Sequence, residues 1–101
     1  MRVLMKVKMP HKAFNSVVKK GNAGKKMQAI LDEMKPEAVY FTDMDGCRTA
    51  IIVTELEKPS MIPALAEPWF LTFNADVEIH VAMTPADVEE AGLDALGEKW
   101  G

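Results

Sequence analysis

"KPEAVYFTDMDGCRTAIIVTEL" (residues 35–56) is the stretch that decides the fold, because it predicts two paired strands. Its Asp45-Gly46 step is the best short-range signal for a two-residue type I′ turn between antiparallel strands. Such a turn fixes the register, and the expected opposite pairs are Met44 with Cys47, Asp43 with Arg48, and Phe41 with Ala50. We therefore predict a hairpin over residues 37–55, with an ion pair between Asp43 and Arg48.

Two further strands follow from alternating apolar residues, the pattern of a half-buried strand. Residues 2–9 place four apolar side chains on one side: Val3, Met5, Val7 and Met9. The strand after Asn74 places Val77, Ile79, Val81 and Met83 on one side and Asp76, Glu78, His80 and Ala82 on the other. The hairpin strands are instead apolar on both faces at residues 39–41 and 51–53, which indicates cover on both sides.

Two amphipathic stripes predict two helices between the first strand and the hairpin. The first stripe consists of Phe14, Val17 and Val18, and the second of Met27, Ile30, Leu31 and Met34. The two stripes point about half a turn apart, so one straight helix cannot bury both. The "KKGNAGKK" segment (residues 19–26) is therefore a break, with Asn22 expected to cap the second helix. This segment lacks the spacing of a phosphate-binding loop.

Proline and threonine residues mark the remaining helices. A helix over residues 60–72 is expected to start at Ser60, and Pro68 should kink or divide it. A C-terminal helix is expected to start with Thr84 as its cap, and Trp100 is expected to anchor its end.

The element order is βαββαβ with a terminal helix, which predicts one ferredoxin-like α+β domain over residues 1–101. Two main helices can cover only one face of a four-stranded sheet. The other face then combines apolar hairpin residues with the charged residues of the first and last strands, a surface that is rarely left open on a small monomer. We therefore predict a two-fold symmetric homodimer that packs these sheet faces together, leaving the polar part to line a central cavity.

The composition indicates a globular protein and excludes several function classes. The chain has 101 residues, of which 49% are hydrophobic, and its net charge of −3 gives no strong field to attract nucleic acid or an anionic membrane. The N-terminal segment interrupts its apolar residues with Arg2, Lys6 and Lys8, unlike a signal peptide. The single cysteine, Cys47, permits no internal disulfide. We expect a cytoplasmic protein with neither a nucleic-acid nor a membrane partner.

Two segments carry a resemblance to a known superfamily: "KPEAVYFTDMDG" (residues 35–46) and above all "PALAEPWFLTFNADVEIHVAMTPADVE" (residues 63–89). With the order of the elements, they resemble small bacterial proteins of the dimeric α+β barrel superfamily, in an uncharacterised branch. The resemblance covers roughly residues 1–90 and includes no diagnostic catalytic motif. It implies a ferredoxin-like protomer and a dimer with its sheets face to face. Relatives include cofactor-independent monooxygenases, haem-degrading enzymes and isomerases, so the fold leaves the function open.

The candidate ligand-binding residues are Lys6, Tyr40, Trp69, Glu78 and His80. His80 and Glu78 lie two residues apart on one side of the last strand, where the histidine could act as an acid or base. The alternative is structural: Lys6 and Lys8 pair with Glu78 and Asp76 as a charge ladder, and His80 bonds to a neighbour in a dimer interface. Trp69 could form one wall of the cavity or belong to the core.

Metal and cofactor chemistry is not indicated by the sequence. His11 and His80 are far apart, and neither has a carboxylate cluster at metal-ligand spacing. Cys47 has no nearby histidine that could activate it as a nucleophile. We expect neither a metal nor a cofactor.

Two functional classes remain open from the sequence. The leading hypothesis is a homodimeric module that binds a small molecule or a partner without catalysis. The alternative is an enzyme of the monooxygenase or isomerase kind that acts on a small organic substrate in the barrel cavity, with His80 as its base.

Overall fold

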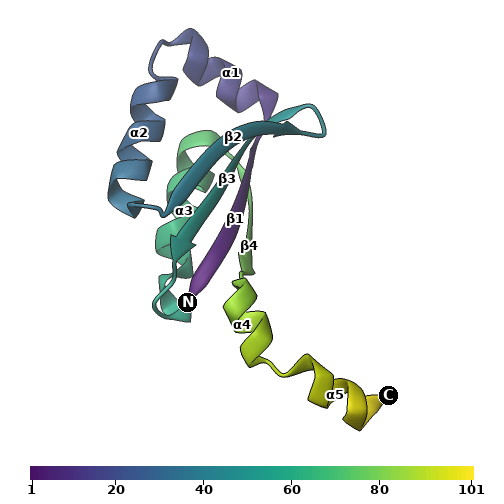
Figure 1. Cartoon of the computed structure of the whole chain (residues 1–101). Coiled ribbons are helices and arrows are strands. Elements are labelled where there is room, and N and C mark those ends of the chain that lie inside the picture. Colours follow the sequence, from purple (N-terminus) through teal and green to yellow (C-terminus); the bar gives the residue numbers. More distant parts are fainter.

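Four antiparallel strands form one sheet in the order β2-β3-β1-β4, and helices cover one of its faces (Figure 1). The computed structural model describes residues 1–101. The elements are β1 (Arg2–Met9), α1 (His11–Lys19), α2 (Ala23–Met34), β2 (Ala38–Met44), β3 (Cys47–Glu55), a 3-10 turn (Pro59–Met61), α3 (Ile62–Phe73), β4 (Asp76–Val81), α4 (Pro85–Glu90) and α5 (Leu93–Trp100). The fold class is α+β, as predicted.

The predicted hairpin is confirmed, including its turn and its register. Asp45 and Gly46 have φ angles of 55° and 74°, the left-handed values that a type I′ turn requires at both positions. All three expected residue pairs face each other across β2 and β3. The predicted ion pair is wrong, however. Arg48 faces Asp43 in the register, but its guanidinium donates to Asn15 Oδ1 at 2.8 Å and lies over the Phe14 ring.

The core lies between the sheet and the layer formed by α1, α2 and α3. The predicted apolar side of β1 is fully buried there, together with alternate residues of β3. Three aromatic rings pack against it: the Phe73 ring lies 5.2 Å from Phe14 and 5.9 Å from Trp69, both tilted. Such rings supply much of the buried apolar area in a chain of this size.

The break between the first two helices is confirmed, but its expected cap is not. Gly21 adopts a φ of 77° where the chain turns from α1 into α2. Asn22 occupies the N-cap position of α2 without a side-chain hydrogen bond, because its backbone (φ −125°, ψ 14°) is not in the extended region of a usual cap. Its Oδ1 atom is buried without a partner.

Two predictions for α3 are wrong, namely its cap at Ser60 and its division at Pro68. Pro59–Met61 form a 3-10 turn that leads into the helix, so α3 begins at Ile62 and Ser60 is not its cap. Pro68 lacks the N–H that would donate to the carbonyl of Ala64, yet α3 continues through it undivided. The buried Trp69 and Phe73 side chains offset the lost hydrogen bond by holding this turn against the sheet.

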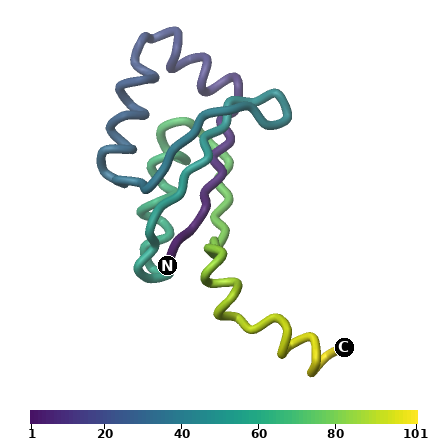
Figure 2. The backbone as a smooth tube through the Cα atoms, in the orientation of Figure 1, coloured from purple at the N-terminus to yellow at the C-terminus, as the bar shows by residue number.

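The C-terminal segment leaves the body of the molecule (Figures 1 and 2). Thr84 caps α4 as predicted: Asp87 N donates to Thr84 Oγ1, and Thr84 N donates to Asp87 Oδ2. The single expected helix is divided at Gly92, whose φ is 69°. Trp100 is 77% exposed, so the prediction that it anchors the end of the chain is wrong.

Candidate functional site

The face of the sheet opposite α1, α2 and α3 is covered by no helix, and we call it the open face (Figure 1). Strand alternation and register place side chains of all four strands on it, including Leu4, Lys6, Lys8, Ala38, Tyr40, Ile51, Val53, Asp76, Glu78 and His80. The side chains of β2 and β3 are mainly apolar, whereas those of β1 and β4 are mainly charged. This division of the face agrees with the sequence pattern.

One row across the open face brings together three of the predicted site residues. Tyr40 pairs with Ile51, Ile51 with Lys6, and Lys6 with Glu78. His80 lies in the neighbouring row, opposite Leu4. Tyr40 is 70% exposed, a high value for an aromatic side chain in the middle of a strand. The row therefore offers an aromatic ring, a methyl surface, a cation and an anion in order.

Glu78 contacts both His80 and Lys6, and the three side chains form a small charge cluster. Its Oε1 lies 3.1 Å from His80 Nε2, and its Oε2 lies 3.5 Å from Lys6 Nζ. The hydrogen bond with His80, and then the charge of Lys6, hold the pKa of Glu78 below its ordinary value. When Nε2 carries the proton shared with Glu78, Nδ1 is the basic nitrogen of the imidazole. The cluster can therefore orient a histidine base, or pair with charges across an interface.

The expected charge ladder is only half formed. Lys6 pairs with Glu78, but Lys8 contacts Asp45 in the hairpin turn at 3.3 Å rather than its register partner Asp76. This hydrogen bond raises the pKa of Lys8. The turn brings a carboxylate to the end of β1, which the strand pattern alone did not indicate.

The low pKa of Glu78 predicts how its charge responds to pH. A carboxylate whose folded pKa is lowered stabilises the fold above its ordinary pKa, and this contribution is lost as the pH falls through the lowered pKa. Replacing His80 with alanine removes the larger cause, so the Glu78 pKa should rise toward its ordinary value. Carbon-detected NMR titration of the carboxyl group measures this. An equal pKa in both proteins would contradict the account, and Glu57, which has no such partner in the structure, is the internal control.

Trp69 is not part of this cluster. It lies in α3, on the helix-covered side of the sheet, and it is completely buried. Its indole Nε1 is buried there without a hydrogen-bond partner. The structure therefore separates Trp69 from Lys6, Tyr40, Glu78 and His80 by the full thickness of the sheet.

A second recess, which the sequence did not reveal, lies beside the hairpin. This hairpin groove has a volume of about 290 Å³ and is lined by Met9, Phe14, Met27, Phe41, Thr42, Arg48 and Thr49. Its volume is near the lower bound of ligand sites, roughly 300 Å³, and its lining is mostly apolar with one cation. The exposed Phe41 is the one available signal, because its register position places it on the covered side of the sheet.

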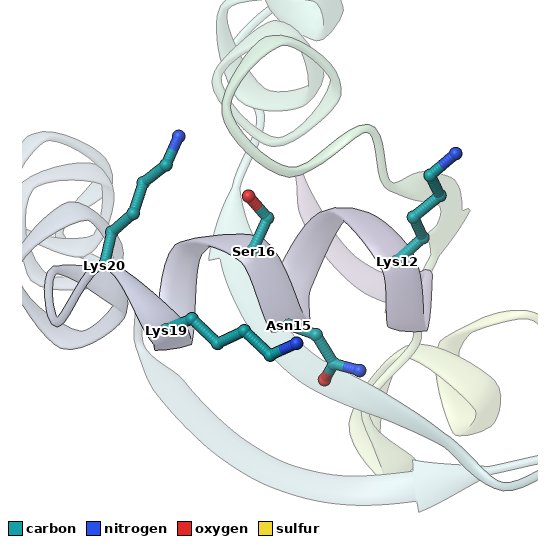
Figure 3. Close-up of a pocket in the computed structure, with 5 residues that line it drawn as sticks. All are labelled: Lys12, Asn15, Ser16, Lys19 and Lys20. Atoms are coloured by element: carbon teal, nitrogen blue, oxygen red, sulfur yellow. The ribbon is translucent and has the colours of Figure 1, made fainter.

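Lysines dominate the outer surface of α1. Figure 3 shows a recess of about 480 Å³ lined by Lys12, Asn15, Ser16, Lys19 and Lys20. All five side chains come from α1 and the residue that follows it, and no glycine-rich backbone cradles the space. This surface presents flexible ammonium groups without the backbone amides of a phosphate-binding loop.

The comparisons with known proteins give no family for this chain. No family model matches it, and no curated protein matches it at a significant level. None of its helices combines the length and the apolar character needed to cross a membrane. No group of three or more His, Cys, Asp or Glu side chains is placed to hold a metal ion.

Proposed function

We propose that this chain is a homodimeric binding module whose two copies pair through their open faces. The observation that carries the proposal is the exposed Tyr40 beside the half-buried Ile51 and Val53, on a sheet face that no helix covers. An apolar surface rimmed by charges is typical of an interaction site rather than of a free surface. Sedimentation equilibrium of the wild-type chain tests this pairing, with a dimer as the expected result.

The proposal includes a ferredoxin-like protomer in a dimeric α+β barrel, as in the bacterial proteins that the sequence resembles. The strand order β2-β3-β1-β4 supports it, since α1 and α2 connect β1 to β2 and α3 connects β3 to β4. The half-buried Cys47, with no second cysteine, supports a cytoplasmic location.

Two-fold symmetry gives a specific role to the charge cluster. In an isologous interface each contact between two different groups occurs twice, so the Lys6 side chain of each copy can lie near the carboxylates of the other. When two open faces pack together, their apolar halves are buried and their polar halves line a cavity between the two sheets. Lys6, Tyr40, Glu78 and His80 are the residues that we propose to line it and to contact a small molecule.

A second candidate function is catalysis with His80 as general base. The contact of 3.1 Å between His80 and Glu78 favours it, because a carboxylate bonded to one ring nitrogen orients the imidazole and leaves the other nitrogen free to accept a proton. A small organic substrate would then enter the cavity between the two sheets and lose a proton to Nδ1.

Replacing His80 with alanine separates these functions. The exposed His80 ring makes one side-chain contact, so we expect the variant to fold and to remain a dimer. Binding of small phenols, followed by calorimetry, should weaken about 10-fold if one charge-assisted hydrogen bond is lost. Unchanged binding would exclude His80 from the ligand site, and a monomeric variant would make the histidine structural. Oxygen uptake with the same phenols, present in the wild type and lost in the variant, would support the enzyme.

A further inference from the structure

Two short helices extend beyond β4, and together with the residues around them they form the C-terminal arm (residues 84–101). Neither α4 nor α5 contributes a buried residue, and Figures 1 and 2 show both pointing away from the body. The radius of gyration of 16.9 Å exceeds the roughly 13 Å of a compact domain of this length. The arm therefore lies outside the core of its own chain.

The arm needs a surface to pack against. Helices of 6 and 8 residues are far below the length of about 12–15 residues at which an isolated helix becomes even marginally stable in water. Leu93, Leu96 and Trp100 follow the i, i+3, i+7 spacing and form one apolar stripe along α5, and all three are exposed. Such a stripe is stabilised by docking on an apolar groove.

The charge of the chain is strongly segregated. Residues 1–31 contain eight Lys and Arg and no Asp or Glu, whereas residues 32–101 contain four Lys and Arg and fifteen Asp and Glu. The arm itself has five acidic residues and a single cation, Lys99. The arm is thus complementary to the lysine-rich α1 and α2 and not to the rest of the molecule.

A groove between α2 and α3 fits the arm in both shape and charge. This α2–α3 groove has a volume of about 380 Å³ and is lined by Lys26, Ala29, Ile30, Leu71 and Thr72. Leu71 is 82% exposed at its edge. Lys25 and Lys26 lie in the first turn of α2, and Lys26 lines the groove. Lys19 and Lys20 lie at the end of α1. An apolar floor with ammonium groups at one end suits an acidic amphipathic helix.

We propose that the C-terminal arm of one copy docks in the α2–α3 groove of a second copy. Leu93, Leu96 and Trp100 would fill the groove, and the net negative charge of the arm would be attracted to the lysines at the end of α1 and the start of α2. The groove of the same chain is poorly placed: Leu71 lies at the end of the sheet where β4 begins, and the arm leaves where β4 ends. When each copy docks its arm in the groove of the other, both grooves are filled and a closed two-fold dimer results.

The inference goes beyond the pairing of the open faces and does not depend on it. The arm and the α2–α3 groove share no residue with the open face. A variant that breaks one contact can therefore leave the other intact. The two experiments also report different quantities, namely the mass of the particle and the environment of Trp100.

The environment of Trp100 tests the exchange. In a Trp69→Phe protein, Trp100 is the single fluorophore, and its emission should move to shorter wavelength as the protein concentration rises. Excess copies without tryptophan (Trp69→Phe, Trp100→Phe) should cause the same shift. If Trp69→Phe does not fold, iodide quenching of the wild type reports on Trp100, because Trp69 is buried.

Variants of the groove give the matched controls. Leu71→Glu in the tryptophan-free copies should weaken the shift by at least about 10-fold, the loss expected for one buried leucine. Ile62→Glu on the same helix should not, since Ile62 lies outside the groove. Lys25→Glu with Lys26→Glu should weaken the shift, and Lys58→Glu should not. Added salt should weaken it as well.

Three results would overturn the inference. Trp100 emission that never departs from that of a solvent-exposed ring shows no docking. A blue shift that is independent of concentration shows that the arm folds back on its own chain. Binding of a short DNA duplex that requires Lys25 and Lys26, with Trp100 still exposed, assigns the basic surface to nucleic acid instead.

Discussion

Replacing Trp69 with alanine is expected to lower the free energy of unfolding by about 3–5 kcal/mol, the loss typical of an aromatic residue removed from a packed core. Trp69 is completely buried in α3 and packs against Phe73. Domains of this size have about 5–15 kcal/mol of stability in total, so the variant should be largely unfolded well below the melting temperature of the wild type. Urea unfolding measures the loss, at a fixed protein concentration because association adds to the apparent stability.

Trp69→Phe is the matched control. The indole N–H is buried without a partner, which costs roughly 1–3 kcal/mol, and phenylalanine removes that group along with part of the ring. The phenylalanine variant should therefore lose less than about 1.5 kcal/mol. Equal losses for the two variants would show that the indole is bonded, either to water or to a group on its own chain.

Replacing Ile51 with lysine, in a protein whose arm docking is also blocked by Leu71→Glu, is expected to convert the dimer into monomers. Ile51 lies between Tyr40 and Lys6 in the central row of the open face, so the new ammonium group would be buried beside a like charge. Two-fold symmetry places the change in the interface twice. The lost apolar burial alone, about 1.5–3 kcal/mol, weakens the dimer on the order of 100-fold. Analytical ultracentrifugation measures the shift.

Ile62→Lys controls for the introduction of a lysine as such. Ile62 is 39% exposed at the start of α3, on the layer of helices away from the open face. This variant should keep the wild-type mass. Circular dichroism must show folded protein for both variants. A dimer that survives Ile51→Lys but not Ile62→Lys would assign the interface to the helices.

Local signals made most of the fold predictable. The Asp45-Gly46 turn allows few alternatives, and it fixed the hairpin and its register through backbone sterics alone. The alternation in β1 likewise identified the buried side, because a strand exposes successive residues to opposite faces. These inferences depend on neighbours in the sequence, which is why they were confirmed.

The errors arose where a distant part of the chain competes for a residue. Arg48 contacts Asn15 and Phe14 from α1 instead of Asp43, and the sequence gives no measure of that competition. Pro68 is accommodated because the Trp69 and Phe73 side chains on the same helix are buried. Trp100 was expected to pack on the body, but α4 leaves the body directly after β4 and α5 continues away from it.

The sequence predicted which strand residues share one side of the sheet, but it did not predict which aromatic side chains are buried behind the sheet. Alternation placed Lys6, Glu78 and His80 on one side of the sheet, and the register brought Tyr40 into their row. Trp69 was predicted to form either part of the core or one wall of the cavity, and the structure places it in the core, behind the sheet. The hairpin groove escaped notice because its residues come from β1, both helices of the first crossover and the hairpin.

Sedimentation equilibrium of the wild-type chain over a wide range of concentrations tests the central claim most directly. Two sheets that shield each other's bare side should give a particle of twice the 11.2 kDa chain mass, dissociating only on dilution. A particle of single-chain mass at the highest concentration, with Tyr40 and Ile51 still in contact with water, would contradict it.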